Sequence, residues 1–262
     1  MAQNMELQER YSPLVEAKLR ATSIFSNLFN RRYEGTPTAG AVKIPVRSEA
    51  VVSAYDMAKG VAMKTPNTTY KTLVCDVDLA VNELIDDCYA SSVSDGMIAD
   101  RLDSAGYALG NEIDMRLITL LTSEGKHTAP STGETKVVNQ LLDTLAEARS
   151  IKVDPNAMWV AISPKLRAEI KKDPTWISAA DMTDLKGGAI GMLDGVPVYE
   201  SANLTEKHFI VANSTYCHYV QAWAVPVSLN DLADGDHIGA SAIQGRIVCG
   251  YDVTKPETVF YK

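Results

Sequence analysis

A run of apolar residues at helical spacing between Ser92 and Glu124 constrains the fold of this chain more than any other stretch. Its members recur at steps of three or four: Ile98, Leu102, Ala105, Leu109, Ile113, Leu117 and Leu120. This spacing places them on one face of a single helix. Ser92 with Asp95 is a candidate capping pair, and Gly125 suits the end of the helix. A helix of about 27 residues is about 40 Å long. It is therefore expected to act as a beam whose apolar face something covers, the alternative being the longest helix of an α+β enzyme.

Composition favours one folded body with two lobes. The chain has 262 residues, of which 46% are hydrophobic and 22% charged, so it is long enough to bury a large core. No apolar run approaches the ~20 residues of a membrane span. The leader MAQNMELQERYSP lacks the apolar centre of a signal peptide. We therefore expect no membrane contact and no export.

Charge and cysteine spacing exclude two further classes. A net charge of -8 and a pI near 5.1 argue against a dedicated nucleic-acid binder, which needs a basic face. The four cysteines, at positions 75, 88, 217 and 249, form no CxxC or Cys/His cluster. The sequence therefore predicts free thiols in a reducing cytoplasm rather than a zinc module or a redox pair.

The N-terminal segment predicts a short helix over 12–30, with Ser12 as cap and Pro13 at the first helical position. Its apolar residues cover more than one stripe: Leu14, Leu19, Ile24, Phe25, Leu28 and Phe29. Such a segment needs partners on two sides. They come either from a neighbouring subunit or from the segment's own domain.

Between Thr36 and Ala80 the apolar period changes to two, which predicts half-buried strands. One strand carries Val42, Ile44 and Val46, and the other carries Leu73, Cys75, Val77 and Leu79. The stretch between them contains breakers but no apolar face large enough for its own core. A long two-stranded hairpin results, and because isolated hairpins are marginal in water, it needs support from another surface. Residues 81–90 are predicted to be helical.

After Gly125 the pattern predicts a second lobe. A helix is expected over 137–151, then a buried strand, AMWVAIS, that runs into a helix capped by Ser163 with Pro164 in its first turn. The pair Asp194 and Gly195 predicts a tight turn between short strands. Strands are predicted over 207–214, 216–229, 245–253 and 257–262.

Motifs that carry chemistry are missing from the sequence. There is no GxGxxG after a strand, P-loop, HExxH, GxSxG or EF-hand loop. Cys217 and His218 are adjacent on a predicted strand and point to opposite faces, so they do not share a proton. The loop DLADGDH, residues 231–237, resembles a metal loop only loosely and is expected to be a solvated turn. No catalytic, cofactor-binding or metal residue is assigned.

The order of parts resembles that of a known family. Two stretches carry the likeness: YSPLVEAKLRATSIFSNLFN leading into AGAVKIPVRSEA, and GAIGMLDGVPVYESANL followed by a strand. Together with the long hairpin and the beam helix they resemble the tailed-bacteriophage major capsid proteins of the Hong Kong 97-type fold, which encapsulin shells share. The resemblance implies an α+β fold with an N-arm over 1–35, an E-loop over 36–80, a peripheral domain over 81–136 with a spine helix over about 94–124, an axial domain over 137–240, and return strands over 241–262.

The same resemblance implies that the chain assembles into hexamers and pentamers of an icosahedral phage head around double-stranded DNA. It implies inter-subunit contacts in the E-loop, through Val51, Val52, Tyr55, Val61 and Met63, and in the N-arm, through Leu14, Leu19, Phe25, Leu28 and Phe29. Expected partners are copies of the chain, a separate scaffolding protein, a portal protein and, non-specifically, packaged DNA. The expected location is the virion, with assembly in the host cytoplasm. An encapsulin-like cellular compartment and a soluble α/β hydrolase are the alternatives.

Overall fold

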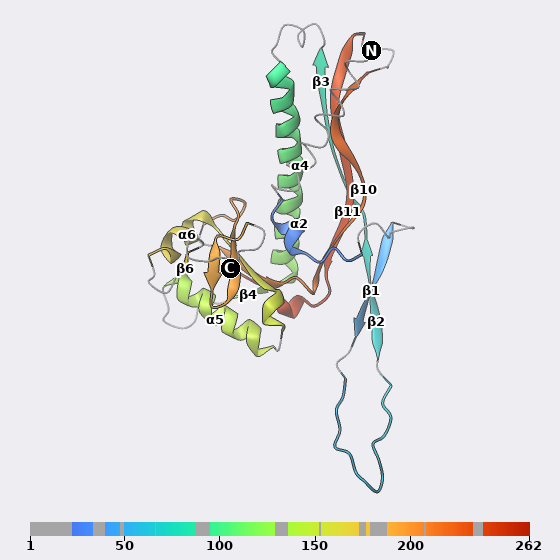
Figure 1. Ribbon diagram of the computed structural model, residues 1–262, viewed down its shortest axis with the longest axis vertical. Helices are drawn as coiled ribbons and strands as arrows, with labels where there is room; N and C mark the ends of the chain where they lie inside the picture. Colours follow the sequence, from blue (N-terminus) through green and yellow to red (C-terminus); the bar gives the residue numbers. More distant parts are fainter. Residues whose placement is uncertain are drawn as a thin grey trace.

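The computed structural model describes residues 23–33, 40–47, 50–65, 67–86, 95–128, 136–151, 153–172, 177–178, 188–206, 208–232 and 238–262. Figure 1 shows an elongated molecule in which a long helix runs beside a narrow sheet. A lobe of strands and two helices lies at one end of the helix. A slender hairpin projects away from the body at the same end (Figure 1).

Helix α4, Asp95–Glu124, confirms the predicted beam. Its inner face is buried from Leu102 to Leu121, by Leu102, Ala105, Leu109, Ile113, Leu117 and Leu121. This face packs on an antiparallel sheet of order β10-β11-β3, made of Cys217–Asp231, Ala240–Val253 and Val77–Asp86. Within the described residues, no helix is both long and apolar enough to cross a membrane.

The lobe is built on a mixed sheet of order β4-β12-β9-β5-β8-β7-β6. In that order the strands are Lys126–His127, Phe260–Tyr261, Phe209–Asn213, Met158–Ile162, Val196–Glu200, Gly191–Leu193 and Ile177–Ser178. Helices α5, Val137–Ser150, and α6, Pro164–Ile170, pack on one face around a second core. The 3-10 turns η1, Pro155–Ala157, and η3, Pro256–Thr258, precede β5 and β12.

Two local predictions in the lobe are confirmed. The Ser163 hydroxyl accepts a hydrogen bond from the Leu166 amide at 3.2 Å and caps α6. Asp194 and Gly195 both have positive φ, 50° and 78°, between the antiparallel strands β7 and β8. Asp-Gly tolerates this left-handed backbone, which suits a tight hairpin turn.

The projecting hairpin pairs β1, Ala41–Arg47, with β2, Thr68–Val74, in an antiparallel register from Ala41↔Val74 to Arg47↔Thr68. These two strands, the stem, form a sheet of their own. The strand predicted over 73–79 is wrong, because β2 ends at Val74 and β3 begins at Val77 in a different sheet.

The predicted helix over 81–90 is also wrong where the structure describes it. Residues 81–86 continue β3, which pairs with β11 over ten residues of strand. Val77, Leu79, Val81 and Ile85 face the core under α4 at a period of two. The ladder to β11 therefore decides the conformation of a stretch whose local pattern was ambiguous.

Candidate functional site

The stem of the hairpin rests on the end of the body sheet through a small apolar cluster. Ile44 and Leu73 from the stem pack with Val220 of β10, and all three are buried. Gly250 of β11 lies directly beneath the stem, because a Cβ atom there would stand 2.4 Å from the Val74 carbonyl oxygen. The hairpin is thus fitted closely to the body at its base.

Residues 50–65 form the tip of the hairpin, which ends in a defined turn. The Asp56 carboxylate accepts a hydrogen bond from the Ala58 amide at 2.8 Å. The Gly60 amide donates to the Asp56 carbonyl at 2.7 Å, and Gly60 has a positive φ of 66°. Within residues 50–65 the bridge between Asp56 and Gly60 is the only strand-type pairing, so the two sides of the tip do not form a ladder.

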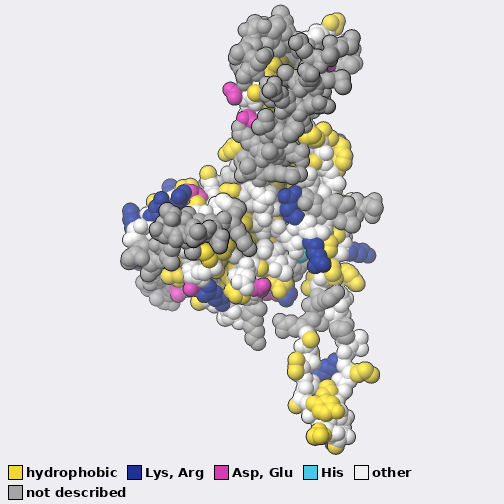
Figure 2. Space-filling model, in the orientation of Figure 1, with side chains coloured by type: hydrophobic (Ala, Val, Ile, Leu, Met, Phe, Trp, Pro, Cys, Tyr) yellow, Lys and Arg dark blue, Asp and Glu magenta, His cyan; other side chains and the backbone are white. Residues whose placement is uncertain are grey.

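The tip carries an apolar patch of six large exposed side chains. Their exposed fractions are Val51 65%, Val52 92%, Tyr55 74%, Met57 95%, Val61 44% and Met63 101%. Figure 2 shows hydrophobic side chains along the projecting hairpin down to its far end. Apolar surface in water costs about 25 cal/mol per Å² relative to burial. Exposed apolar side chains gathered in this number on one projection indicate an interaction site.

All five residues expected from the sequence to make contacts in this loop lie in the apolar patch. Met57 belongs with them and was missed. The signal was present, since Met57 is an apolar residue between Tyr55 and Val61 in a stretch with no core of its own. The contacts that these residues make with another subunit stay a prediction.

The N-terminal residues lie differently from the inter-subunit role expected for them. Phe25, in the short helix α2, Phe25–Leu28, and Phe29 are 0% and 3% exposed. The Phe25 ring packs edge-on against Trp159 of the lobe at 5.8 Å between centroids. Their partners are therefore inside this chain, as the alternative of packing on its own domain required. Leu28 is half-buried, and the described residues do not include Leu14 and Leu19.

A buried carboxylate on α4 anchors this segment. Asp114 is 3% exposed and accepts hydrogen bonds from the Ser23 hydroxyl at 2.8 Å, the Ile24 amide at 2.9 Å and the Phe25 amide at 3.2 Å. Burial raises the pKa of Asp114, while these hydrogen bonds oppose the rise. No local pattern indicates this role, because Asp114 stands beside the apolar face of the helix like an ordinary surface charge.

The described residues offer little for catalysis. Burial raises the pKa of the Cys217 thiol to about 12, so it carries no nucleophilic thiolate at neutral pH. The described part of the chain contains no group of three or more His, Cys, Asp and Glu side chains placed to share a metal ion. Of the loop 231–237, Asp231 and Leu232 are described, and the rest lies outside the described residues.

Comparison with known proteins gives a family and a fold. Residues 90–261 match the family model described as phage capsid protein. The fold is similar to that of a chain from Mycobacterium phage Che8, with a TM-score of 0.71 and 22% identity over 91% of this chain and 90% of that one. It is also similar to the capsid structure of the cyanophage P-SCSP1u, with a TM-score of 0.67 and 11% identity over 91% and 87% of the two chains.

A third similar structure comes from an archaeon. The virus-like particle from Pyrococcus furiosus matches with a TM-score of 0.61 and 15% identity, over 98% of this chain and 99% of that chain. At these identities the three likenesses establish the Hong Kong 97-type fold expected from the sequence. A search of curated proteins found no match.

Proposed function

Because the chain belongs to the phage capsid protein family, it is a major capsid protein of a virion, and we propose that its copies close into the hexamers and pentamers of an icosahedral head around double-stranded DNA. The observation that carries this proposal is the apolar patch on the tip, which projects far from the chain's own core. A projection of one copy that lies on the body of the next is a heterologous contact, and such contacts generate closed rings.

The parts of the chain divide naturally by this role. We assign the N-arm to 1–35, the E-loop to 36–80, the peripheral domain to 81–136 with return strands over 241–262, and the axial domain to 137–240. In the E-loop, Val51, Val52, Tyr55, Val61 and Met63 make the inter-subunit contacts, and Met57 joins them. In the N-arm this role remains for Leu14, Leu19 and the half-buried Leu28.

A separate scaffolding protein, a portal protein and packaged DNA are the further partners that we propose. An acidic chain, with a net charge of -8, avoids holding the DNA tightly. Assembly takes place in the host cytoplasm. We assign the chain no enzymatic activity.

The test replaces apolar side chains of the tip by charges. The double variant Val61→Asp with Met63→Asp is expected to stay folded, because both side chains lie outside the chain's own core, and to form no shells. Particles are measured by light scattering and negative-stain microscopy, and folding is measured by thermal unfolding. A matched control, Lys59→Ser with Lys64→Ser, removes two exposed long side chains of the same loop without touching the patch and should assemble.

Shells of normal size and yield from the double variant would contradict the role of the tip. The contents of parent shells separate the two uses of the fold. Packaged DNA agrees with a phage head, whereas a protein cargo would point to an encapsulin-like compartment. A chain that stays monomeric under every condition would return attention to the hydrolase alternative and to Asp234 and Asp236, whose replacement by alanine would then abolish activity.

A further inference from the structure

The stem meets the body at the base of the hairpin through an apolar cluster, a close fit over Gly250 and hydrogen bonds. The stem and the body sheet share no ladder of hydrogen bonds, since β1 and β2 form a two-stranded sheet by themselves. The apolar cluster of Ile44, Leu73 and Val220 is the smallest of the three cores. The apolar cluster and the close approach of the stem to Gly250 hold the base of the hairpin on the body, but neither supplies a directional bond.

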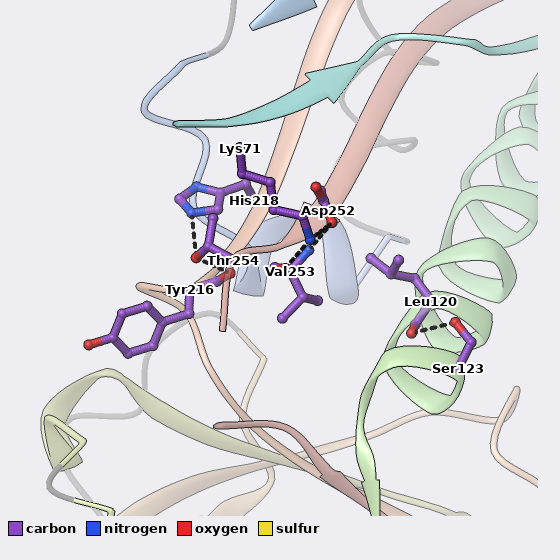
Figure 3. A network of polar contacts seen from close by, with 8 residues as sticks. All are labelled: Lys71, Leu120, Ser123, Tyr216, His218, Asp252, Val253 and Thr254. Carbon is purple, nitrogen blue, oxygen red and sulfur yellow. Dashed lines mark hydrogen bonds and ion pairs between the residues drawn. The ribbon is translucent and has the colours of Figure 1, made fainter. Parts of the chain in front are cut away.

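The Lys71 side chain crosses from the stem to the body with directional bonds. The Lys71 ammonium of β2 donates to the Asp252 carboxylate at 2.7 Å and to the Val253 carbonyl at 2.7 Å, both on β11 (Figure 3). The same Asp252 oxygen also accepts a hydrogen bond from the Val253 amide at 2.7 Å, which holds the carboxylate in place. We call this pair of Lys71 bonds the latch.

The residues around the latch shield it partly from solvent. The Lys71 side chain is 37% exposed and that of Asp252 is 18% exposed. His218 of β10 stands directly across from Asp252 in the ladder, and Thr254 lies 3.4 Å from its ring nitrogen Nε2. A charged pair in such a site is stronger than one on the open surface, yet solvent still reaches it.

The length of the hairpin magnifies any change at the latch. Met57 at the turn lies 14 positions before Lys71, which in extended chain spans up to about 45 Å. A rotation of about 10° at the base would move the turn by about 8 Å over that length. The apolar patch meets its partner surface only if the base is held to a narrow range of angles.

We propose that Lys71 is the positioning residue of the hairpin: its two bonds to Asp252 and Val253 fix the angle at which the tip leaves the body. The expected effect of this angle on the fidelity of assembly rests on the proposed function. The claim that Lys71 sets the angle rests only on the contacts of the stem. These bonds lie within one chain and reach no other copy, so the effect of Lys71 on assembly is indirect.

The experiment measures the angle directly and compares it with assembly. Spin labels go on cysteines at Met57→Cys in the tip and Tyr107→Cys on the exposed face of α4, with Cys75 and Cys88 replaced by serine. Pulsed dipolar spectroscopy of the unassembled chain then gives the distribution of distances between them. Lys71→Met, which keeps the length of the side chain but removes the charge, is expected to turn a narrow distribution into one broadened by several ångströms, and to replace regular shells with irregular particles.

Two further variants make the result decisive. Lys43→Met removes an exposed lysine from β1 of the same stem and should leave both the distribution and the shells unchanged. Lys71→Arg keeps a charged donor of similar reach and should give a distribution narrower than that of Lys71→Met. An unchanged distribution in Lys71→Met, or a Lys71→Arg distribution as broad as that of Lys71→Met, overturns the proposal. These outcomes do not depend on the tip variant, whose assembly tests the proposed function separately.

Discussion

At the scale of single residues, Asp114 links the N-terminal segment to the beam. Its carboxylate accepts from one hydroxyl and two backbone amides of residues 23–25, all near the buried end of α2. Without these acceptors the amides would be buried and unpaired, and each such group costs about 1–3 kcal/mol. Asp114 therefore holds the same segment by hydrogen bonds that Phe25 holds by apolar packing.

We expect Asp114→Ala to lower the free energy of unfolding by about 2–4 kcal/mol, because it leaves several buried donors without an acceptor. Asp114→Asn should cost less, since one amide oxygen remains to accept. The measurement is urea unfolding at neutral pH. Asp100→Ala, at an exposed carboxylate on the same helix, is the control and should stay within about 0.5 kcal/mol of the parent. Equal stability of Asp114→Ala and the control would show that the hydrogen bonds to Asp114 do not stabilise the folded chain.

His218 predicts how stability depends on pH. The ring is 4% exposed, and its pKa is lowered mainly by burial and further by Lys71, while Asp252 opposes the shift. The centre of the Tyr33 ring lies 5.9 Å from the centre of the His218 ring. Because the folded pKa is below the unfolded value of about 6.5, the unfolded chain binds the proton more readily. The contribution to stability is therefore complete above about pH 6.5 and is lost as the pH falls toward the folded pKa.

We expect His218 to change the free energy of unfolding by at most about 1.4 kcal/mol per pH unit. Urea unfolding between about pH 7.5 and pH 5 measures it in the parent and in His218→Gln, which should show a shallower fall. A parent and a His218→Gln variant with parallel curves would mean that the ring does not titrate differently in the folded chain.

At the scale of elements, the parts that the sequence predicted are those whose signal is local. The beam has seven apolar positions at helical spacing over about six turns, and no other conformation uses that spacing. The cap at Ser163 and the turn at Asp194 are set by the chemistry of two or three neighbouring residues. Such local signals predict the conformation without knowledge of the elements that pack around them.

The errors fall where a distant strand decides the outcome. At the end of the stem the Cys75 amide still bonds to the Gly40 carbonyl at 2.8 Å, whereas Val77 pairs with Cys249 of β11, so the chain passes from one sheet to the other between Cys75 and Val77. The close fit against Gly250 is also invisible in the local pattern. In the same way, residues 81–86 are a strand because β11 lies beside them. The candidate patch was predictable in outline, since exposed apolar residues in a loop without a core need no distant information.

At the scale of the whole molecule, beam and lobe share one core while the hairpin does not. Trp159 and Ala212 of the lobe sheet belong to the same cluster as Leu109 and Ile113 of α4. The stem contributes instead to a separate small cluster. The molecule is thus a stiff body with one slender projection. If the tip binds a neighbouring copy as we propose, each copy in a closed ring gives one tip and receives one, and the contacts are head-to-tail.

Head-to-tail closure predicts that a copy with a defective tip spoils its whole ring. Such a copy receives a neighbour's tip but offers none, so one gap remains. If every member of a six-membered ring must be intact, about one defective copy in ten leaves only about half of the rings complete. Co-expression of the parent with increasing shares of the Val61→Asp, Met63→Asp variant should therefore lower the number of closed particles, counted by microscopy, much faster than the share of the variant rises. Co-expression with the Lys59→Ser, Lys64→Ser variant should not. A loss in simple proportion to the defective share would mean that copies join without each tip being needed, and the head-to-tail arrangement would have to be abandoned.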